Sequence, residues 1–306
     1  GAVRELYAGR ALAALPWILA LVAAVGATAW AAYRLALAAA RAGSAGAPRA
    51  AATGEGGWPL PGRVGALVEK EAKYLLRHPI ATLLALVLPP FAALVAWKVP
   101  PRMPAEAGEI VRVLPVLGFA LYAHMAAQVF WLNAFGWERG GGRLWFLAPV
   151  APAEVLLAKN LAAYGLSAGL FAAAVAAAIA VGGPLPGWAL AAAVALHAGI
   201  APWLLLAGNF VSVLNPRAAA NTVQRGGSLS PLSSLAGMVI VSVATAAFAI
   251  PAVFAVRRDA PWLLVWGWAA LGVAGAIAYR VALPFAARLV VRRREPLLAA
   301  VAGDEE

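Results

Sequence analysis

The sequence predicts an all-α membrane protein, a bundle of about seven spanning helices. Of its 306 residues, 63% are hydrophobic and only 12% are charged. Soluble domains are roughly half apolar and a quarter charged, so the composition indicates a lipid bilayer. A helix needs about 20 apolar residues to cross a hydrocarbon core about 30 Å thick. Seven segments reach that length, at about 12–38, 79–98, 110–133, 156–182, 187–212, 235–256 and 261–283.

The first segment, within residues 1–40, reads as the last spanning helix of a preceding module. Residues 16–34 (PWILALVAAVGATAWAAYR) and 261–280 (PWLLVWGWAALGVAGAIAYR) both begin Pro-Trp and end Ala-Tyr-Arg. Chance likeness in an alanine-rich chain is the alternative; we interpret the two as corresponding helices of a repeat. The chain starts at Gly1, and its first apolar run exceeds the 7 to 15 residues typical of a signal-peptide core. We therefore expect a first module whose beginning is missing.

Residues 41–62 are rich in Gly, Ala and Pro and are expected to form a cytoplasmic linker. The next stretch, 63–77 (RVGALVEKEAKYLLR), carries its apolar residues on one helical face and its charges off it, including Lys70, Glu71 and Lys73. It is predicted to be a helix on the membrane surface, with Glu69 and Lys73 spaced to pair. A surface helix of a soluble domain is less favoured, because a membrane span follows at once.

Basic residues predict the orientation. With the 63–77 helix in the cytoplasm, fourteen Lys and Arg lie on that side and five on the other, a clear positive-inside bias. Residues 133–160, the linker and the carboxyl terminus are then cytoplasmic, in a multi-pass protein of the plasma (inner) membrane. The net charge of +11 comes from residues at the ends of apolar segments. It therefore predicts membrane lipids, and no nucleic acid, as the anionic partner.

The loop at 133–160 (NAFGWERGGGRLWFLAPVAPAEVLLAKN) interrupts the apolar sequence with glycines, charges and prolines. Glycines permit turns that other residues resist. Pro149 and Pro152 stop one helix and let another start, and Glu154 lies near the new N-terminus, where the helix dipole favours an acid. We expect a short crosswise helix that presents Trp145 and Phe146 to a soluble partner. A plain connecting loop is the alternative, but it would not need so many bulky apolar residues.

At these residues the sequence resembles a known family. The pattern N-x-F-G-x-E-x-x-G, then Pro, then E-x-x-x-x-K-N resembles the cytoplasmic coupling loop of permease subunits of type-2 exporter ABC transporters. KEAKYLLRHP resembles that family's connecting helix, and GNFVSVLNPRAAANTVQR, residues 208–225, is similar to the segment after its fourth span. The positions that match the loop pattern are Asn133, Phe135, Gly136, Glu138, Gly142, Pro149, Glu154, Lys159 and Asn160.

The resemblance covers about residues 63–295 and implies a six-span permease module, with a connecting helix at 63–77, a coupling loop at 134–155 and a cytoplasmic tail at 296–306. It implies that the loop positions, together with Arg143, Trp145 and Phe146, receive motion from a separate P-loop ATPase subunit. A second permease module, fused upstream or present as a second copy, is implied as well. ATP and Mg would bind the partner subunit, and this chain would bind no cofactor. Export is expected from the resemblance alone.

The residues themselves bear on the energy source. A P-loop needs a Gly-Lys pair, and none of the four lysines follows a glycine. The acidic residues lie in loops, at span ends or at the termini, which disfavours an ion-driven transporter.

Without cysteine or an H-E-x-x-H motif, thiol and zincin chemistry are excluded, and we expect neither enzyme activity nor a metal site. A membrane-embedded enzyme and a non-transporting scaffold stay open as alternatives.

Two polar pairs inside the spans are candidates for a substrate path. His124 and Gln128 are four residues apart, and Ser242 and Thr245 three apart, so each pair shares a helical face. Polar residues at such positions more often form hydrogen bonds between helices. Both interpretations stay open from the sequence.

Overall fold

The computed structural model describes residues 62–99, 108–218 and 229–302. Over these ranges the chain is helical, without a strand, and six helices are long and apolar enough to cross a membrane. The predicted all-helical, multi-pass character is thereby confirmed, whereas the expected span at 12–38 and the linker lie outside the described residues. The six helices are α4 (Pro79–Lys98), α5 (Glu109–Ala126), α8 (Pro152–Gly182), α9 (Gly187–Leu214), α10 (Pro231–Arg258) and α11 (Trp262–Arg292).

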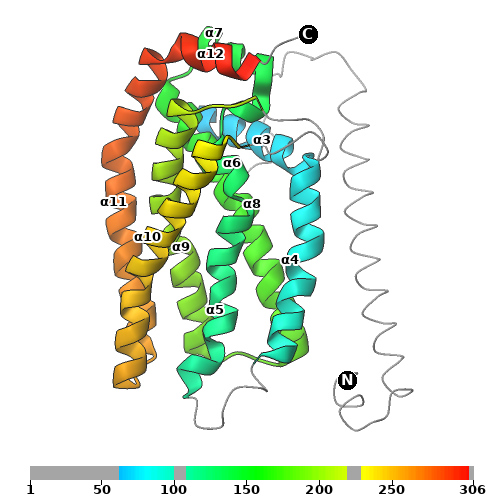
Figure 1. Ribbon diagram of the computed structural model, residues 1–306, viewed down its shortest axis with the longest axis vertical. Helices are drawn as coiled ribbons and strands as arrows, with labels where there is room; N and C mark the ends of the chain where they lie inside the picture. Colours follow the sequence, from blue (N-terminus) through cyan, green and yellow to red (C-terminus); the bar gives the residue numbers. More distant parts are fainter. Residues whose placement is uncertain (1–61, 100–107, 219–228, 303–306) are drawn as a thin grey trace, which may run out of the picture.

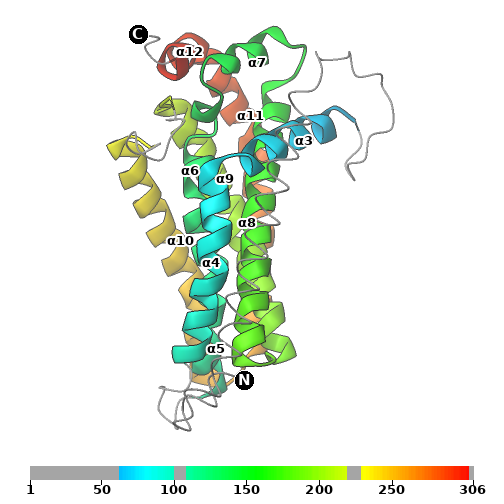
Figure 2. The same cartoon turned by 90° about the vertical axis from the view of Figure 1, so that its right-hand side faces the viewer.

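The spanning helices run side by side, and the short elements gather at one end of the bundle (Figure 1). Helix α3 lies across that end and turns into α4, as the second view shows (Figure 2). We call this the loop end. Its elements are α3 (Gly62–Leu76), α6 (Gln128–Leu132), the 3-10 segment η2 (Gly136–Arg143), α7 (Leu144–Leu147) and α12 (Arg294–Ala302).

Local chemistry explains where several helices begin and end. His78 caps α4 by accepting a hydrogen bond at Nδ1 from the Ile80 backbone N–H, at 3.2 Å, and a proline follows, where its missing N–H costs nothing. At the start of α8 the Glu154 carboxylate accepts from the Ala151 N–H at 3.2 Å. The same helix ends at Gly183, whose φ of 89° favours glycine. These ends confirm the expectation that Glu154 would lie at a helix N-terminus.

The core is held by close contacts between long helices. Helix α9 packs closely along α11, and α8 packs against α3 and α4. A Cβ on Gly272 would lie 2.7 Å from the Cα of Gly199, so the backbones of α9 and α11 touch where neither residue has a side chain. Nearby, the Trp268 indole N–H donates to the Phe248 carbonyl at 2.7 Å and joins α11 to α10. Tight packing of this kind compensates for the absence of a hydrophobic driving force between helices in lipid.

The structure revises three expected boundaries. Helix α8 begins at Pro152 rather than near 156, and the span predicted at 110–133 is divided at Ala127 into α5 and α6. The expected tail at 296–306 is helical as far as Ala302. It packs on η2 and buries Leu297, which is 1% exposed. The helix predicted at 63–77 is confirmed as α3, but Glu71 is buried instead of lying on its polar face.

Candidate functional site

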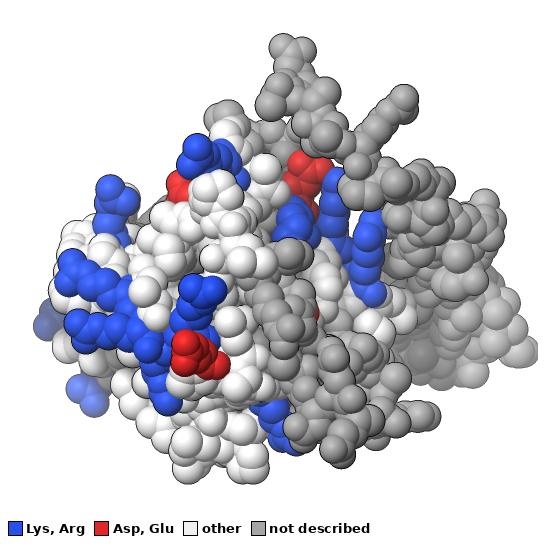
Figure 3. Space-filling view, turned by 90° about the horizontal axis from the view of Figure 1, so that it is seen from above, with Lys and Arg blue, Asp and Glu red and all other residues white. Residues whose placement is uncertain are grey.

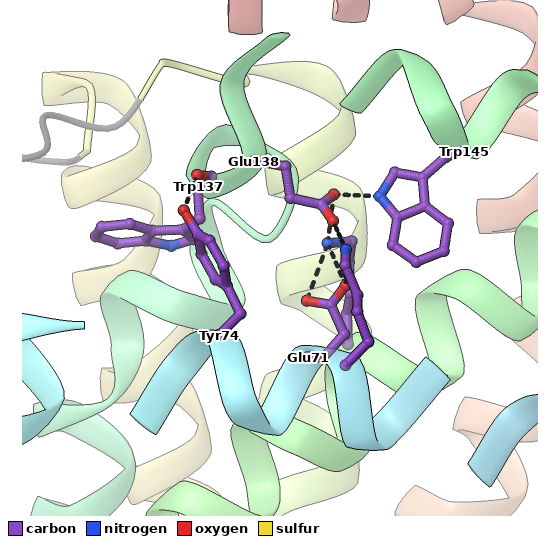
Figure 4. Close-up of polar contacts among 7 residues, drawn as sticks. Glu71, Tyr74, Trp137, Glu138 and Trp145 are labelled. Atoms are coloured by element: carbon purple, nitrogen blue, oxygen red, sulfur yellow. Dashed lines mark hydrogen bonds and ion pairs between the residues drawn. The ribbon is translucent and has the colours of Figure 1, made fainter. Parts of the chain in front are cut away.

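Four charged side chains from three elements meet at the loop end (Figure 4). Lys70 and Glu71 come from α3, Glu138 from η2 and Lys159 from α8. The Lys159 ammonium lies 2.8 Å from the Glu138 carboxylate and 3.2 Å from that of Glu71. Lys70 closes the group through ion pairs with both carboxylates, the one to Glu71 at 2.9 Å. We call these four residues the ion cluster.

The ion cluster is balanced in charge and shielded from water. The side chains of Glu71 and Glu138 are each 6% exposed and that of Lys159 only 3%, whereas Lys70 is 47% exposed. Burial alone would raise the pKa of Glu138, but the charges of Lys159 and Lys70 outweigh it and lower that pKa to about 2. Glu138 is therefore ionised at physiological pH. Removing one member would leave a buried charge without compensation.

Trp145 packs against the ion cluster and is partly buried. Its indole N–H donates to the Glu138 carboxylate, and the Lys70 ammonium lies 4.1 Å from its ring centroid. Phe146 is also partly buried, with the Arg294 guanidinium 5.2 Å from its ring centroid. Trp145 and Phe146 are thus only partly exposed, and their presentation to a partner stays a prediction. Their apolar surfaces bind the loop to α12 and to the ion cluster.

A small apolar cluster lies behind these rings. Phe135, 2% exposed, packs there with Leu156 of α8, Val290 of α11 and Leu297 of α12. The Lys159 ammonium lies 5.5 Å from the Phe135 ring centroid, so this cluster borders the ion cluster. The loop at 133–151 is therefore clamped between α8 and the carboxyl-terminal helices.

Trp137 attaches the same loop to α3 and α4. Its carbonyl accepts a hydrogen bond from the Tyr74 hydroxyl of α3 (Figure 4), and its indole N–H donates to the Val129 carbonyl at 3.1 Å. The His78 ring meets its ring edge-on, with centroids 4.4 Å apart. Neither Trp137 nor Tyr74 was singled out from the sequence.

Asn133 joins the start of the loop to the segment after α9. Its side-chain amide donates to the Arg217 carbonyl at 2.7 Å and accepts from the Arg217 N–H at 3.2 Å. Gly136 lies directly over this joint, and a Cβ there would overlap the Arg217 carbonyl and the Asn133 amide. Asn133 and Arg217, which belong to two segments that the sequence pattern singled out separately, are thus in contact.

We expect Gly136→Ala to destabilise the protein by about 1 to 3 kcal/mol, the usual cost of overpacking a closed site. The overlap is with backbone and with a hydrogen-bonded amide, so neither can move freely. Gly165→Ala is the control, because a Cβ there meets nothing within 4 Å. Thermal unfolding in mild detergent compares the two variants. Equal melting midpoints would show that the joint does not need glycine.

The remaining loop positions differ in exposure. Leu147 ends α7 and is 75% exposed, the largest exposed fraction among the large apolar residues of the described chain. Pro149 beside it is exposed as well, whereas Gly142 is buried inside η2 and Arg143 ends that segment. Leu147 to Pro149 are exposed and apolar, and we call these three residues the exposed apex of the loop.

The four residues expected to line a path differ in burial. His124 accepts from the Ser167 hydroxyl of α8 at 3.1 Å and donates to the His197 carbonyl of α9 at 2.9 Å. Gln128 starts a separate helix after the break at Ala127, and its Oε1 lies 3.5 Å from where a Gly237 Cβ would be. Ser242 and Thr245 are exposed on α10. His124 therefore joins α5, α8 and α9, and the break at Ala127 means that His124 and Gln128 do not lie on one continuous helix. A substrate path along these residues stays a prediction.

Charge and comparison complete the description of the site. Seen from the loop end, Lys and Arg dominate the charged groups of the described surface (Figure 3). Within the described ranges, no three or more His, Asp or Glu residues are grouped so as to hold a metal ion.

Comparison with protein-family models, curated proteins and solved structures found no match to the chain. The sequence pattern and the geometry of the loop end therefore carry the functional inference.

Proposed function

We propose that the chain is the membrane-spanning permease subunit of an ATP-driven, ABC-type exporter, powered by a separate ATPase subunit. The observation that carries this proposal is the ion cluster, which joins the loop rigidly to α3 and α8. A loop that receives force must be attached firmly to the helices that it moves. Three buried or nearly buried charged side chains from three elements supply such an attachment.

A coupling loop also needs a surface that contacts the ATPase, and we assign this role to the exposed apex. Leu147 and Pro149 project beyond the buried cluster, and an apolar protrusion of this kind suits a hydrophobic recess on a soluble partner. The N-x-F-G-x-E pattern, with Glu138 and Lys159 at its positions, supports the same assignment by resemblance. In this proposal the loop end faces the cytoplasm, in keeping with its basic character.

We expect Leu147→Glu to prevent copurification of the ATPase, because a carboxylate at the apex would have to be buried on the partner. Leu76→Glu is the matched control: Leu76 is 62% exposed on α3, at the same end but outside the loop. The tagged full-length protein is purified in mild detergent, and copurifying ATPase is measured. Equal recovery from the wild type and Leu147→Glu would exclude the apex as the docking surface.

An enzyme or a scaffold are the remaining classes, and no observation on the described residues favours either. His124 itself is engaged in hydrogen bonds to α8 and α9, whereas the Nε2 of the stacked His197 ring is buried without a hydrogen-bond partner among the described residues.

A further inference from the structure

A pocket opens on the side of the bundle between α8, α9 and α11, near the loop end. Its volume is about 430 Å³. Its apolar wall includes Leu157, Leu161 and Leu205, and its polar groups are Asn160, Tyr164, Tyr279 and Arg280. The site thus combines hydrocarbon surface with a cation and hydroxyl groups, which suits an amphiphile rather than a purely apolar or purely ionic ligand.

Two polar groups of the pocket, Tyr279 and Arg280, have hydrogen-bond donors that an occupant can use. Asn160 donates from Nδ2 to the Asn209 side-chain oxygen at 2.9 Å and to the Tyr279 hydroxyl at 2.7 Å. Because the Tyr279 oxygen accepts, its hydrogen can be donated onward. Arg280 is exposed in the pocket wall, and within the described parts of the chain no carboxylate forms an ion pair with it. The Arg280 guanidinium and the Tyr279 hydroxyl both belong to residues that line this pocket, and a phosphate can accept hydrogen bonds from both kinds of group.

The position of Arg280 along α11 places it at the membrane surface. Eighteen residues separate it from Trp262 at the opposite end of the helix. At 1.5 Å per residue they span about 27 Å, close to the hydrocarbon thickness of about 30 Å. Its guanidinium therefore reaches the headgroup level of the leaflet at the loop end.

A second, apolar groove continues from this pocket into the membrane. Ala198, Pro202 and Ala276 line both hollows, and the groove extends along α9 as far as Gly187, with a volume of about 700 Å³. From Pro202 to Gly187 it runs about 22 Å, more than the depth of about 15 Å that one leaflet provides. Its wall of small and aliphatic residues offers no hydrogen-bonding side chain to an occupant.

We propose that this pocket and groove together bind one anionic phospholipid from the leaflet at the loop end, with its phosphate at Arg280 and Tyr279 and an acyl chain along α9 and α11. The apolar walls disfavour a purely ionic ligand. The positive charge of Arg280 favours an anionic headgroup over a zwitterionic one. A docked helix would fill the apolar groove but would leave Arg280 without an anion. The inference does not depend on the ATPase and goes beyond the proposed transport function.

The test is native mass spectrometry of the purified full chain with increasing phosphatidylglycerol. We expect saturable binding of one lipid, and about tenfold or greater weakening in Arg280→Gln, which loses a charged hydrogen bond. Arg280→Lys should keep most of the affinity, and Tyr279→Phe should weaken it without changing the packing of the ring. The matched control is Arg288→Gln, because Arg288 lies on the same helix outside the pocket and stacks on Phe285.

Phosphatidylcholine and soluble glycerol phosphate are the two comparison ligands. The proposal predicts weak binding of both. Equal weakening by Arg288→Gln would indicate general attraction to basic residues and would overturn the site, as would equal affinity for phosphatidylcholine. Glycerol phosphate binding as tightly as the lipid would mean a free-anion site. A dimer of the chain that excludes lipid from the groove would also contradict the proposal. The melting midpoint without lipid shows that each variant is folded.

Discussion

Lys159→Met is expected to destabilise the loop end by about 3 to 5 kcal/mol, the typical cost of removing one partner from a buried ion pair. The Lys159 ammonium lies 2.8 Å from Glu138 and 3.2 Å from Glu71, and its side chain is 3% exposed. Without it, two buried carboxylates would share only Lys70. Methionine preserves most of the side-chain volume, so the loss would reflect charge rather than packing. Thermal unfolding in detergent measures the stability.

Two further variants separate charge from packing. Lys159→Met combined with Glu71→Gln restores neutrality to the cluster and should recover part of the loss. Lys73→Met removes the exposed partner of Glu69 on the same helix, where the lysine side chain is 60% exposed. Such surface pairs contribute about 0 to 1 kcal/mol. If Lys159→Met costs no more than Lys73→Met, the ion cluster does not hold the loop.

Glu138→Lys is expected to abolish transport while leaving the protein inserted. The substitution would place three cations around the single carboxylate of Glu71, and it would remove the acceptor of the Trp145 indole N–H. The loop would separate from α3 and α8, but η2 lies outside the six spanning helices. Size-exclusion chromatography and transport in proteoliposomes report the two properties separately. Glu138→Gln is the milder control, since it removes one charge without reversing it.

The spans could be predicted from the sequence because their cause is local. A run of about 20 apolar residues is sufficient to predict a membrane helix, and the ends follow from nearby groups such as Glu154 at the start of α8. The break at Ala127 was missed, since apolar residues continue across it. The hydrophobicity of a segment indicates how long an apolar span is, but it does not indicate where the helix is interrupted within that span.

The candidate site could be predicted only in part. The sequence pattern singled out Glu138 and Lys159, but nothing local showed that they pair, because 21 residues and a turn separate them. Glu71 was assigned to the polar face of an amphipathic helix, yet α8 covers that face and supplies the lysine that neutralises it. Trp145 and Phe146 were expected to face a partner, because the sequence contains no sign that Glu138 and Lys70 would contact the first ring and Arg294 the second. Such long-range pairings depend on the tertiary fold.

The contact between α9 and α11 likewise could not be predicted from the spacing of glycines in the sequence. Gly165 and Gly169 have the spacing of a helix-contact motif, but a Cβ on either meets nothing within 4 Å. Gly199 and Gly272 lie in different helices without a common motif, and they mark the closest approach. In a chain with 30 glycines, the partner helix decides which glycine matters.

Affinity purification of the tagged full-length protein from mild detergent, wild type beside Glu138→Lys, tests the central claim most directly. The recovered material is assayed for a copurifying ATPase and for its rate of ATP hydrolysis. The account predicts that the wild type brings down an active ATPase and that Glu138→Lys loses it or uncouples its hydrolysis from transport. If neither sample contains an ATPase, or if the variant matches the wild type in both assays, the proposed coupling function is contradicted.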